Sequence, residues 1–172
     1  MFALGLLILR LVVGLTLAAH GAQKLFGWWG GSGMAGWTGA MNRMRLRPAS
    51  GWAWTSAIAE FVGGLALAAG FLFPIPTAAI AASMLVAIAL VHLPKGFFNN
   101  KGGYEFNLSV LAAVVALALT GPGAVSLDAV LGVHFPEPIT ATVVAIVTLL
   151  GVAGALLTRA PEPVAETKPR TT

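Results

Sequence analysis

The first apolar segment of the chain, residues Leu4 to Phe26, constrains the fold more than any other feature. It is long enough for a helix that crosses a membrane, which needs about 20 mainly apolar residues. It nevertheless carries the polar side chains Arg10, His20, Gln23 and Lys24. Ionisable groups in hydrocarbon are costly and therefore usually face a protein interior or a wet cavity. Gly14 and Ala18 follow Arg10 at four-residue steps, so we expect this side of the helix to pack against neighbouring helices.

The composition supports a membrane-embedded chain. Of the 172 residues, 58% are hydrophobic and only 9% are charged, whereas soluble domains carry about 25% charged residues. The net charge of +4 comes from basic residues in the loops, so it indicates membrane topology rather than nucleic-acid binding. The absence of cysteine excludes a disulfide framework, a thiolate metal site and thiol redox chemistry within this chain. The first segment has no basic start, so we expect a retained helix rather than a signal peptide.

Apolar segments recur along the chain, and no strand pattern competes with them. We therefore predict an all-α, polytopic transmembrane helix bundle that forms one domain over residues 1–158. The expected helices are residues 4–26, 52–73, 76–93, 105–120 and 139–158. Residues 27–51 are rich in glycine and tryptophan and predict an interfacial loop with a short surface helix near Met34 to Met44. The polar, proline-rich residues 159–172 predict a disordered cytoplasmic tail.

The basic residues predict the orientation. With five spans, the first loop, the third loop and the tail lie on one side of the membrane. These segments hold Lys24, Arg43, Arg45, Arg47, Lys95, Lys101, Arg159, Lys168 and Arg170. The opposite side holds none. The positive-inside rule therefore places the N-terminus outside and the C-terminus in the cytoplasm of a multi-pass protein of the inner membrane.

The helix directions bring polar residues to the cytoplasmic half of the bundle. Glu60 lies inside the second segment, and the end of the third segment and the start of the fourth lie on that same side. We predict a polar-lined intramembrane cavity that reaches from the cytoplasmic face to mid-membrane and ends near Arg10. Its expected members are Arg10, His20, Gln23, Lys24, Glu60, His92, Lys95, Tyr104 and Glu105. Such a cavity can hold a quinone headgroup, because its donors suit carbonyl oxygens and a carboxylate with histidine can move protons.

Each of these residues also has a structural interpretation. Arg10 and Glu60 can form an ion pair that joins the first two helices. The two histidines can bond nearby backbone, and Lys24 and Lys95 can reach lipid headgroups. Glu105 suits the first turn of a helix, and His134 in the outer loop has no assigned role. A haem or metal at His20 and His92 is not favoured, because neither belongs to a dense ligand motif.

Three stretches of the sequence resemble the DoxX family of small membrane proteins. The first is LGLLILRLVVGLTLAAHGAQKLFG, which ends in a run from His20 to Gly27. The second is AIAEFVGGLALAAGF, which is centred on Glu60. The third is HLPKGFFNNKGGYEFNLSVLAAVVALAL, which joins the third and fourth segments. Together they cover residues Leu4 to Thr120.

This resemblance implies a four-helix membrane core related to the small DoxD subunit of thiosulfate:quinone oxidoreductase. It also implies an association with membrane redox complexes of bacteria or with oxidative-stress defence. The sequence departs from the family by continuing through a fifth apolar segment and a tail, which can serve partner contact.

The leading hypothesis is a redox-associated membrane subunit that binds a quinone or a similar apolar ligand. It would work with a redox partner protein, as a subunit of a quinone-linked membrane oxidoreductase, or as a homo-oligomer. Two alternatives stay open. One is a transporter or channel for protons or a small solute, with Arg10 and Glu60 as its gate. The other is a non-catalytic membrane scaffold whose buried charges only fix helix pairing.

Overall fold

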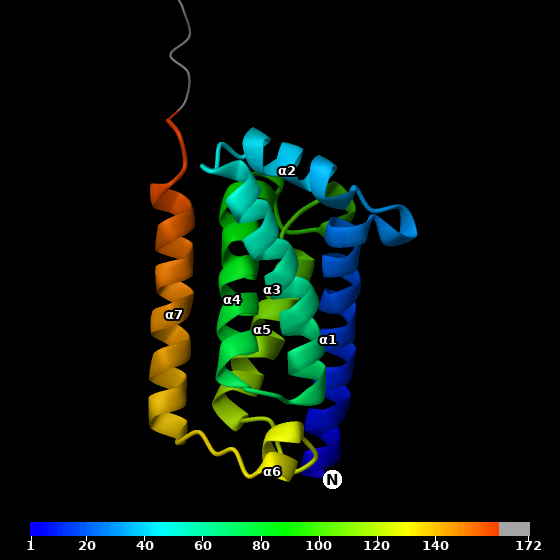
Figure 1. Cartoon of the computed structure of the whole chain (residues 1–172), viewed down its shortest axis with the longest axis vertical. Coiled ribbons are helices and arrows are strands. Elements are labelled where there is room, and N and C mark those ends of the chain that lie inside the picture. The colour runs from blue at the N-terminus through cyan, green and yellow to red at the C-terminus, as the bar shows by residue number, and fades with distance from the viewer. Residues whose placement is uncertain (162–172) are drawn as a thin grey trace, which may run out of the picture.

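The computed structural model describes residues 1–161, and all regular elements in this range are helices. Five helices run along the bundle in alternating directions: α1 (Phe2–Phe26), α3 (Ala49–Ala69), α4 (Pro74–Ala87), α5 (Glu105–Thr120) and α7 (Glu137–Leu157) (Figure 1). The predicted all-α bundle is therefore confirmed. The short helix α2 (Gly33–Arg43) crosses one end of the bundle, and α6 (Leu127–Leu131) lies at the other end.

Four of the long helices meet the length and apolarity that a membrane span requires. They are Phe2–Phe26, Ala49–Ala69, Pro74–Lys95 and Thr140–Leu157. Helix α5 is apolar but has only 16 residues, or about 24 Å at 1.5 Å per residue, which is short of a hydrocarbon core of about 30 Å. It lies among the longer helices (Figure 1). With α5 counted, the chain passes along the bundle five times, so the N-terminus and the end of α7 lie at opposite ends.

The observed helix ends differ from the predicted ones for local reasons. The second helix was expected to reach residue 73 but ends at Gly70, which adopts the left-handed conformation with φ 67°. Glycine favours this conformation because it has no Cβ atom. The third helix continues past Ala87 as a π turn over Ile88–His92 and a 3-10 turn over Leu93–Lys95. Pro94 cannot donate a backbone hydrogen bond, and its ring crowds the preceding turn, so regular α geometry is lost there.

Helices α1 and α3 make the closest approach in the bundle. The buried side of α1 includes Gly14, Ala18 and Gly21, as the spacing of small residues predicts. A Cβ atom added to Gly21 would overlap the backbone of Phe61, which shows how near the two helices come. Small residues allow this approach, and van der Waals packing then supplies attraction that lipid cannot. The apolar core behind this contact includes Leu17, Leu67, Ile80 and Val114.

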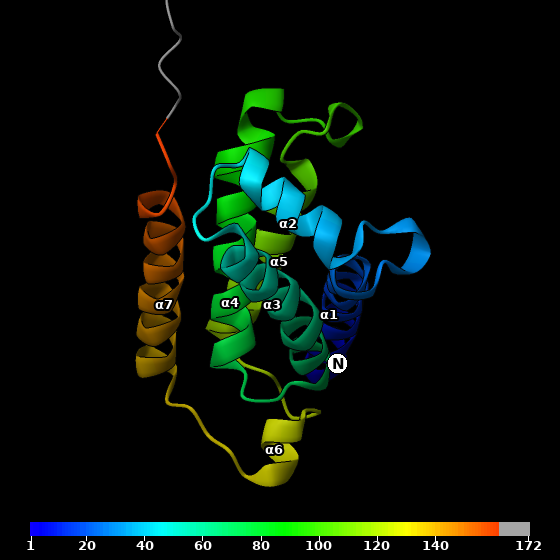
Figure 2. The same ribbon diagram turned by 45° about the horizontal axis from the view of Figure 1, so that its top comes forward.

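The expected surface helix is present as α2. It has a single buried residue, Met41, which packs with Leu46 and Ala53 near the start of α3. The rest of α2 lies across the ends of the long helices (Figure 2). Its exposed end carries Arg43. Helix α2 therefore forms a cover over one end of the bundle.

Helix α7 lies at the edge of the bundle (Figure 2) and packs mainly on α4. The hydroxyl of Thr148 on α7 donates to the carbonyl of Ala78 on α4 at 3.3 Å. The residues that follow α7 are joined to the α2–α3 connection by an antiparallel bridge between Leu46 and Arg159. The tail was expected to begin at residue 159, but Arg159 and Ala160 both bond this connection. The remainder of the predicted disordered tail, residues 162–172, lies outside the described residues.

Candidate functional site

An ion pair between Lys24 and Glu60 lies inside the bundle near the α2 end. Lys24 comes from the last turn of α1 and Glu60 from the middle of α3. The lysine and glutamate side chains are 17% and 6% exposed, and the ammonium donates to Oε2 of the carboxylate. The other carboxylate oxygen, Oε1, accepts from the hydroxyl of Ser83 on α4 at 3.3 Å. Three helices therefore meet at one buried carboxylate.

Helix α2 closes this pair from the end of the bundle. The Lys24 ammonium lies 4.2 Å from the centre of the Trp37 ring, a distance at which a cation is attracted to an aromatic face. The Trp37 indole is itself held, because its Nε1 donates to the hydroxyl of Ser56 at 2.9 Å. Ser56 in turn donates to the carbonyl of Trp52 at 2.8 Å. The site thus contains a hydrogen-bond donor, a buried carboxylate and a flat aromatic surface.

The expected ion pair between Arg10 and Glu60 is wrong. The Arg10 guanidinium lies against Gly70, which follows Glu60 by ten positions, or about 15 Å of helix. Side chains on a helix lean toward its N-terminus, so Arg10 points away from Glu60 whereas Lys24 points back toward it. The structural interpretation of Lys24, in which it reaches lipid headgroups, does not hold, and the same geometry explains why it meets the buried carboxylate instead.

Arg10 belongs to a separate cluster at the α6 end. It is 1% exposed and donates to the carbonyl of Val125, three residues before the buried Asp128. The Asp128 carboxylate accepts from the backbone N–H groups of Leu72 at 2.8 Å and Phe73 at 3.0 Å. The carboxylate thereby holds the α3–α4 turn against α6. Arg10 therefore bonds the connection at the α6 end rather than the Lys24–Glu60 pair.

His20 and Gln23 lie on α1 near the ion pair but are not among its partners. The His20 side chain is exposed, and its ring centre lies 5.4 Å from that of Phe106 on α5. Gln23 is half-buried, and its backbone lies so close to Gly31 that a Cβ atom there would overlap it. Gln23 thus supports the turn that leads from α1 into α2.

The remaining predicted residues form the connection between α4 and α5. His92 Nδ1 lies 2.7 Å from the carbonyl of Gly102, so it bonds the backbone as the structural interpretation expects. Glu105 accepts from the N–H of Asn99 at 2.9 Å, and the Tyr104 ring meets the edge of Phe97. Lys95 is exposed. These residues hold a compact loop at the α2 end and do not contact the Lys24–Glu60 pair.

Sequence reasoning missed Trp37, Ser56 and Ser83 as neighbours of the charged pair. Ser83 did carry a signal, because it is a polar residue within the apolar run of α4. Asp128 carried a signal as well, because serine is a common residue at the start of a helix and Ser126 precedes it by two positions. In the structure Ser126 does cap α6, since its hydroxyl accepts from the N–H of Ala129 at 3.2 Å. Within residues 1–161, no group of three or more histidine, aspartate and glutamate side chains is placed to hold a metal ion.

The comparisons with known proteins agree with the resemblance of the sequence. The family model described as DoxX matches residues 5–93, which include both members of the Lys24–Glu60 pair. No curated protein and no solved structure matches the chain.

Proposed function

This chain belongs to the DoxX family of membrane proteins, and we propose that it is a redox-associated membrane subunit that binds a quinone or a similar apolar ligand. The observation that carries this proposal is the buried Lys24–Glu60 pair beneath Trp37. Burying two charges costs several kcal/mol per ion, about as much as their attraction returns. A chain that needed only helix packing would gain as much from apolar residues at these positions, so a functional role is favoured.

The chemistry of the pair suits a quinone headgroup. A quinone supplies reversible two-electron chemistry that is coupled to protons. Lys24 would donate a hydrogen bond to a carbonyl oxygen of the headgroup, and Glu60 would hold and transfer a proton beside it. Ser83 would orient the carboxylate through its hydrogen bond to Oε1. The indole of Trp37 would offer a flat surface for the ring and would exclude water.

The other polar residues have supporting roles in this proposal. His20 and Gln23 would border the headgroup site from α1, and Arg10 would fix the opposite end of the bundle. The loop with His92, Lys95, Tyr104 and Glu105 would lie at the surface where a redox partner protein or a second copy of the chain docks. The catalytic steps would then be shared with that partner.

We further propose that the α2 end faces the cytoplasm of a bacterial inner membrane, with residues 1–158 acting as one membrane domain. The exposed basic residues of the described chain gather at this end: Arg43, Arg47, Lys95, Lys101 and Arg159. The connections at the other end, residues 70–76 and 121–136, contain no lysine or arginine. Tags placed at the two termini test the orientation. A C-terminal tag that is reached only from outside intact cells contradicts it.

A binding experiment tests the headgroup site directly. The protein in lipid nanodiscs is titrated with a water-soluble short-chain quinone while tryptophan fluorescence is recorded. We expect saturable quenching that is lost in Lys24→Met and strongly reduced in Trp37→Phe. Lys95→Met and Trp54→Phe are matched controls, because both side chains are exposed and lie outside the pair, and they should bind as the wild type does.

The same preparation separates the alternatives. If the wild-type protein shows no saturable quenching, the quinone site is wrong. Proton flux into liposomes that disappears in Glu60→Gln would then favour a transporter. Absence of both signals, together with a partner that co-purifies in fixed ratio, would favour the scaffold.

A further inference from the structure

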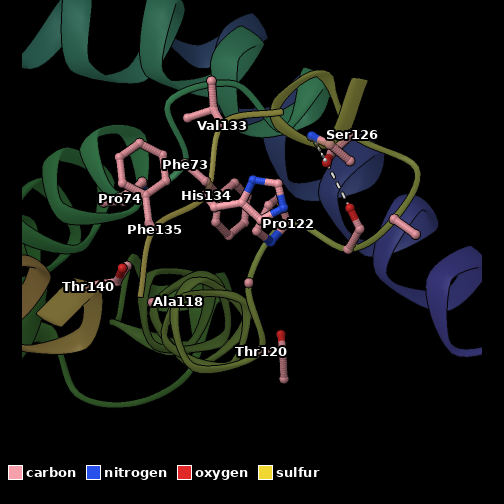
Figure 3. A pocket seen from close by; sticks show the side chains of 14 residues that line it. Phe73, Pro74, Ala118, Thr120, Pro122, Ser126, Val133, His134, Phe135 and Thr140 are labelled. Carbon is pink, nitrogen blue, oxygen red and sulfur yellow. Dashed lines mark hydrogen bonds between the residues drawn. The ribbon is translucent and has the colours of Figure 1, made fainter. Parts of the chain in front are cut away.

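A second candidate site lies at the opposite end of the bundle from the Lys24–Glu60 pair. A pocket of about 320 Å³ opens there between the start of α4, the end of α5 and the segment around α6 (Figure 3). Its volume is at the lower end of the range of small-molecule sites, about 300–1,000 Å³. Its lining includes Phe73, Pro74, Thr120, Pro122, His134 and Phe135.

The walls of the pocket favour an uncharged ring. The side chains of Phe73, Phe135, Pro74 and Pro122 present apolar, mostly flat surfaces. None of the lining side chains that the structure describes is an aspartate, glutamate, lysine or arginine, so a charged ligand would lose water without gaining a counter-charge from them. A compact neutral molecule with an apolar ring therefore fits these walls best.

The hydroxyl groups of the pocket already donate hydrogen bonds to backbone carbonyls. Thr120 donates to the carbonyl of Ala116 at 2.9 Å, and Thr140 donates to that of Pro136 at 2.9 Å. Ser126 donates to the carbonyl of Gly123 at 2.7 Å. A hydroxyl has one proton and two lone pairs. These three groups can therefore offer a ligand only acceptor atoms.

His134 lines the pocket from an exposed position and offers a further acceptor. Its Nδ1 lies 2.8 Å from the carbonyl of Gly132. A carbonyl only accepts, so Nδ1 carries the proton, and in the neutral imidazole Nε2 keeps its lone pair. Figure 3 shows the imidazole reaching into the pocket toward Pro122. Nε2 of this lining residue is thus the imidazole acceptor that the Gly132 bond leaves available to a ligand.

The floor of the pocket is fixed before any ligand binds. Ser126 lines the pocket, and its neighbour Val125 accepts from the buried Arg10. Asp128 holds the N–H of Phe73, which forms another wall. These tertiary bonds join the pocket to the buried outer cluster. Little ordering is therefore needed on binding, which favours affinity.

We propose that this pocket binds a neutral, hydroxyl-bearing ring compound of the phenol class, whose O–H donates to Nε2 of His134. The site is independent of the quinone proposal, because it uses none of the residues near Lys24 and Glu60. The ring would lie among the aromatic and proline side chains.

The test uses the full chain in lipid nanodiscs, labelled with ¹⁵N at histidine. The chain has three histidines, so the imidazole signals can be assigned with single variants. The probe is 4-propylphenol, and its methyl ether, 4-propylanisole, is the matched control because it lacks only the donating hydrogen. We expect 4-propylphenol to shift the His134 signals saturably and to bind about threefold to tenfold more tightly than the ether, which is the value of one hydrogen bond.

Two variants keep the result interpretable. His134→Phe retains a ring but removes the acceptor, and it should lower phenol affinity by the same factor while leaving ether affinity unchanged. Ala129→Phe fills the pocket from an exposed position and should abolish binding of both probes. Val130→Phe, at an exposed neighbouring position that does not line the pocket, should bind like the wild type. Equal affinity for phenol and ether, or unchanged binding in Ala129→Phe, overturns the proposal, as does the absence of a saturable His134 shift.

Discussion

Gly14 of α1 and Gly64 of α3 lie against each other with no space for a side chain between them. A Cβ atom added to either glycine would lie 2.5 Å from the carbonyl oxygen of the other. The two backbones therefore touch at this crossing. The contact sets the distance between α1 and α3 and, with it, the position of Lys24 opposite Glu60.

Substitution of either crossing glycine should destabilise the bundle. Gly14→Ala or Gly64→Ala would force the helices apart, and we expect a loss of about 1–3 kcal/mol, the usual cost of overpacking. Unfolding in a denaturing detergent measures it. Gly5→Ala is the matched control, because its added Cβ meets nothing within 4 Å. It should be neutral or stabilising by up to about 1 kcal/mol, since alanine favours helix. Equal destabilisation by all three variants contradicts the crossing.

The Lys24–Glu60 pair should show strong coupling. Lys24→Met or Glu60→Met alone leaves one buried charge without a partner, and we expect each to cost about 3–5 kcal/mol of stability. The double variant should cost less than either single variant, because no unpaired charge is left. A double-mutant cycle based on unfolding measures the coupling. Additive effects of the two substitutions would show that the charges do not interact.

Asp128 should control the start of α4. Asp128→Asn keeps the size of the side chain but leaves one acceptor oxygen for the two N–H groups of Leu72 and Phe73. We expect a loss of about 1–3 kcal/mol, the cost of a buried donor without a partner. Amide hydrogen exchange at Leu72 and Phe73 should become faster. Glu105→Gln, which alters a more exposed bond to Asn99, should leave these amides unchanged.

Trp52 should hold the end of α7. Its Nε1 donates to the hydroxyl of Thr158 at 2.9 Å, so Trp52→Phe should remove about 0.5–1.5 kcal/mol. The effect should be confined to the last turn of α7. It is measured as faster exchange of the amide hydrogens in that turn. Trp54→Phe is the control, since Trp54 is 52% exposed on the same helix. Similar exchange in both variants would mean that the bond does not hold α7.

The sequence predicts most of the secondary structure because apolar length and helix breakers are local properties. Residues 105–120 are helical as expected, and the surface helix lies close to Met34 to Met44. Errors occur where the local signal is weak. The second helix was predicted to continue to residue 73 because the residues after Gly70 are apolar. In the structure it ends at Gly70, which adopts the left-handed conformation. The π turn before Pro94 was not predicted. The proline is visible in the sequence, but its presence alone does not say which irregular turn will form before it.

The sequence identified the charged residues of the candidate site but not which residues they contact. The sequence determines that Arg10, Lys24 and Glu60 must be buried or paired, because hydrocarbon does not tolerate free charge. Only the tertiary structure decides that Glu60 meets Lys24 and that Arg10 bonds the carbonyl of Val125. The reason is geometric. Partners depend on the axial register of packed helices, which the Gly14–Gly64 contact sets, and on the lean of each side chain toward its helix N-terminus.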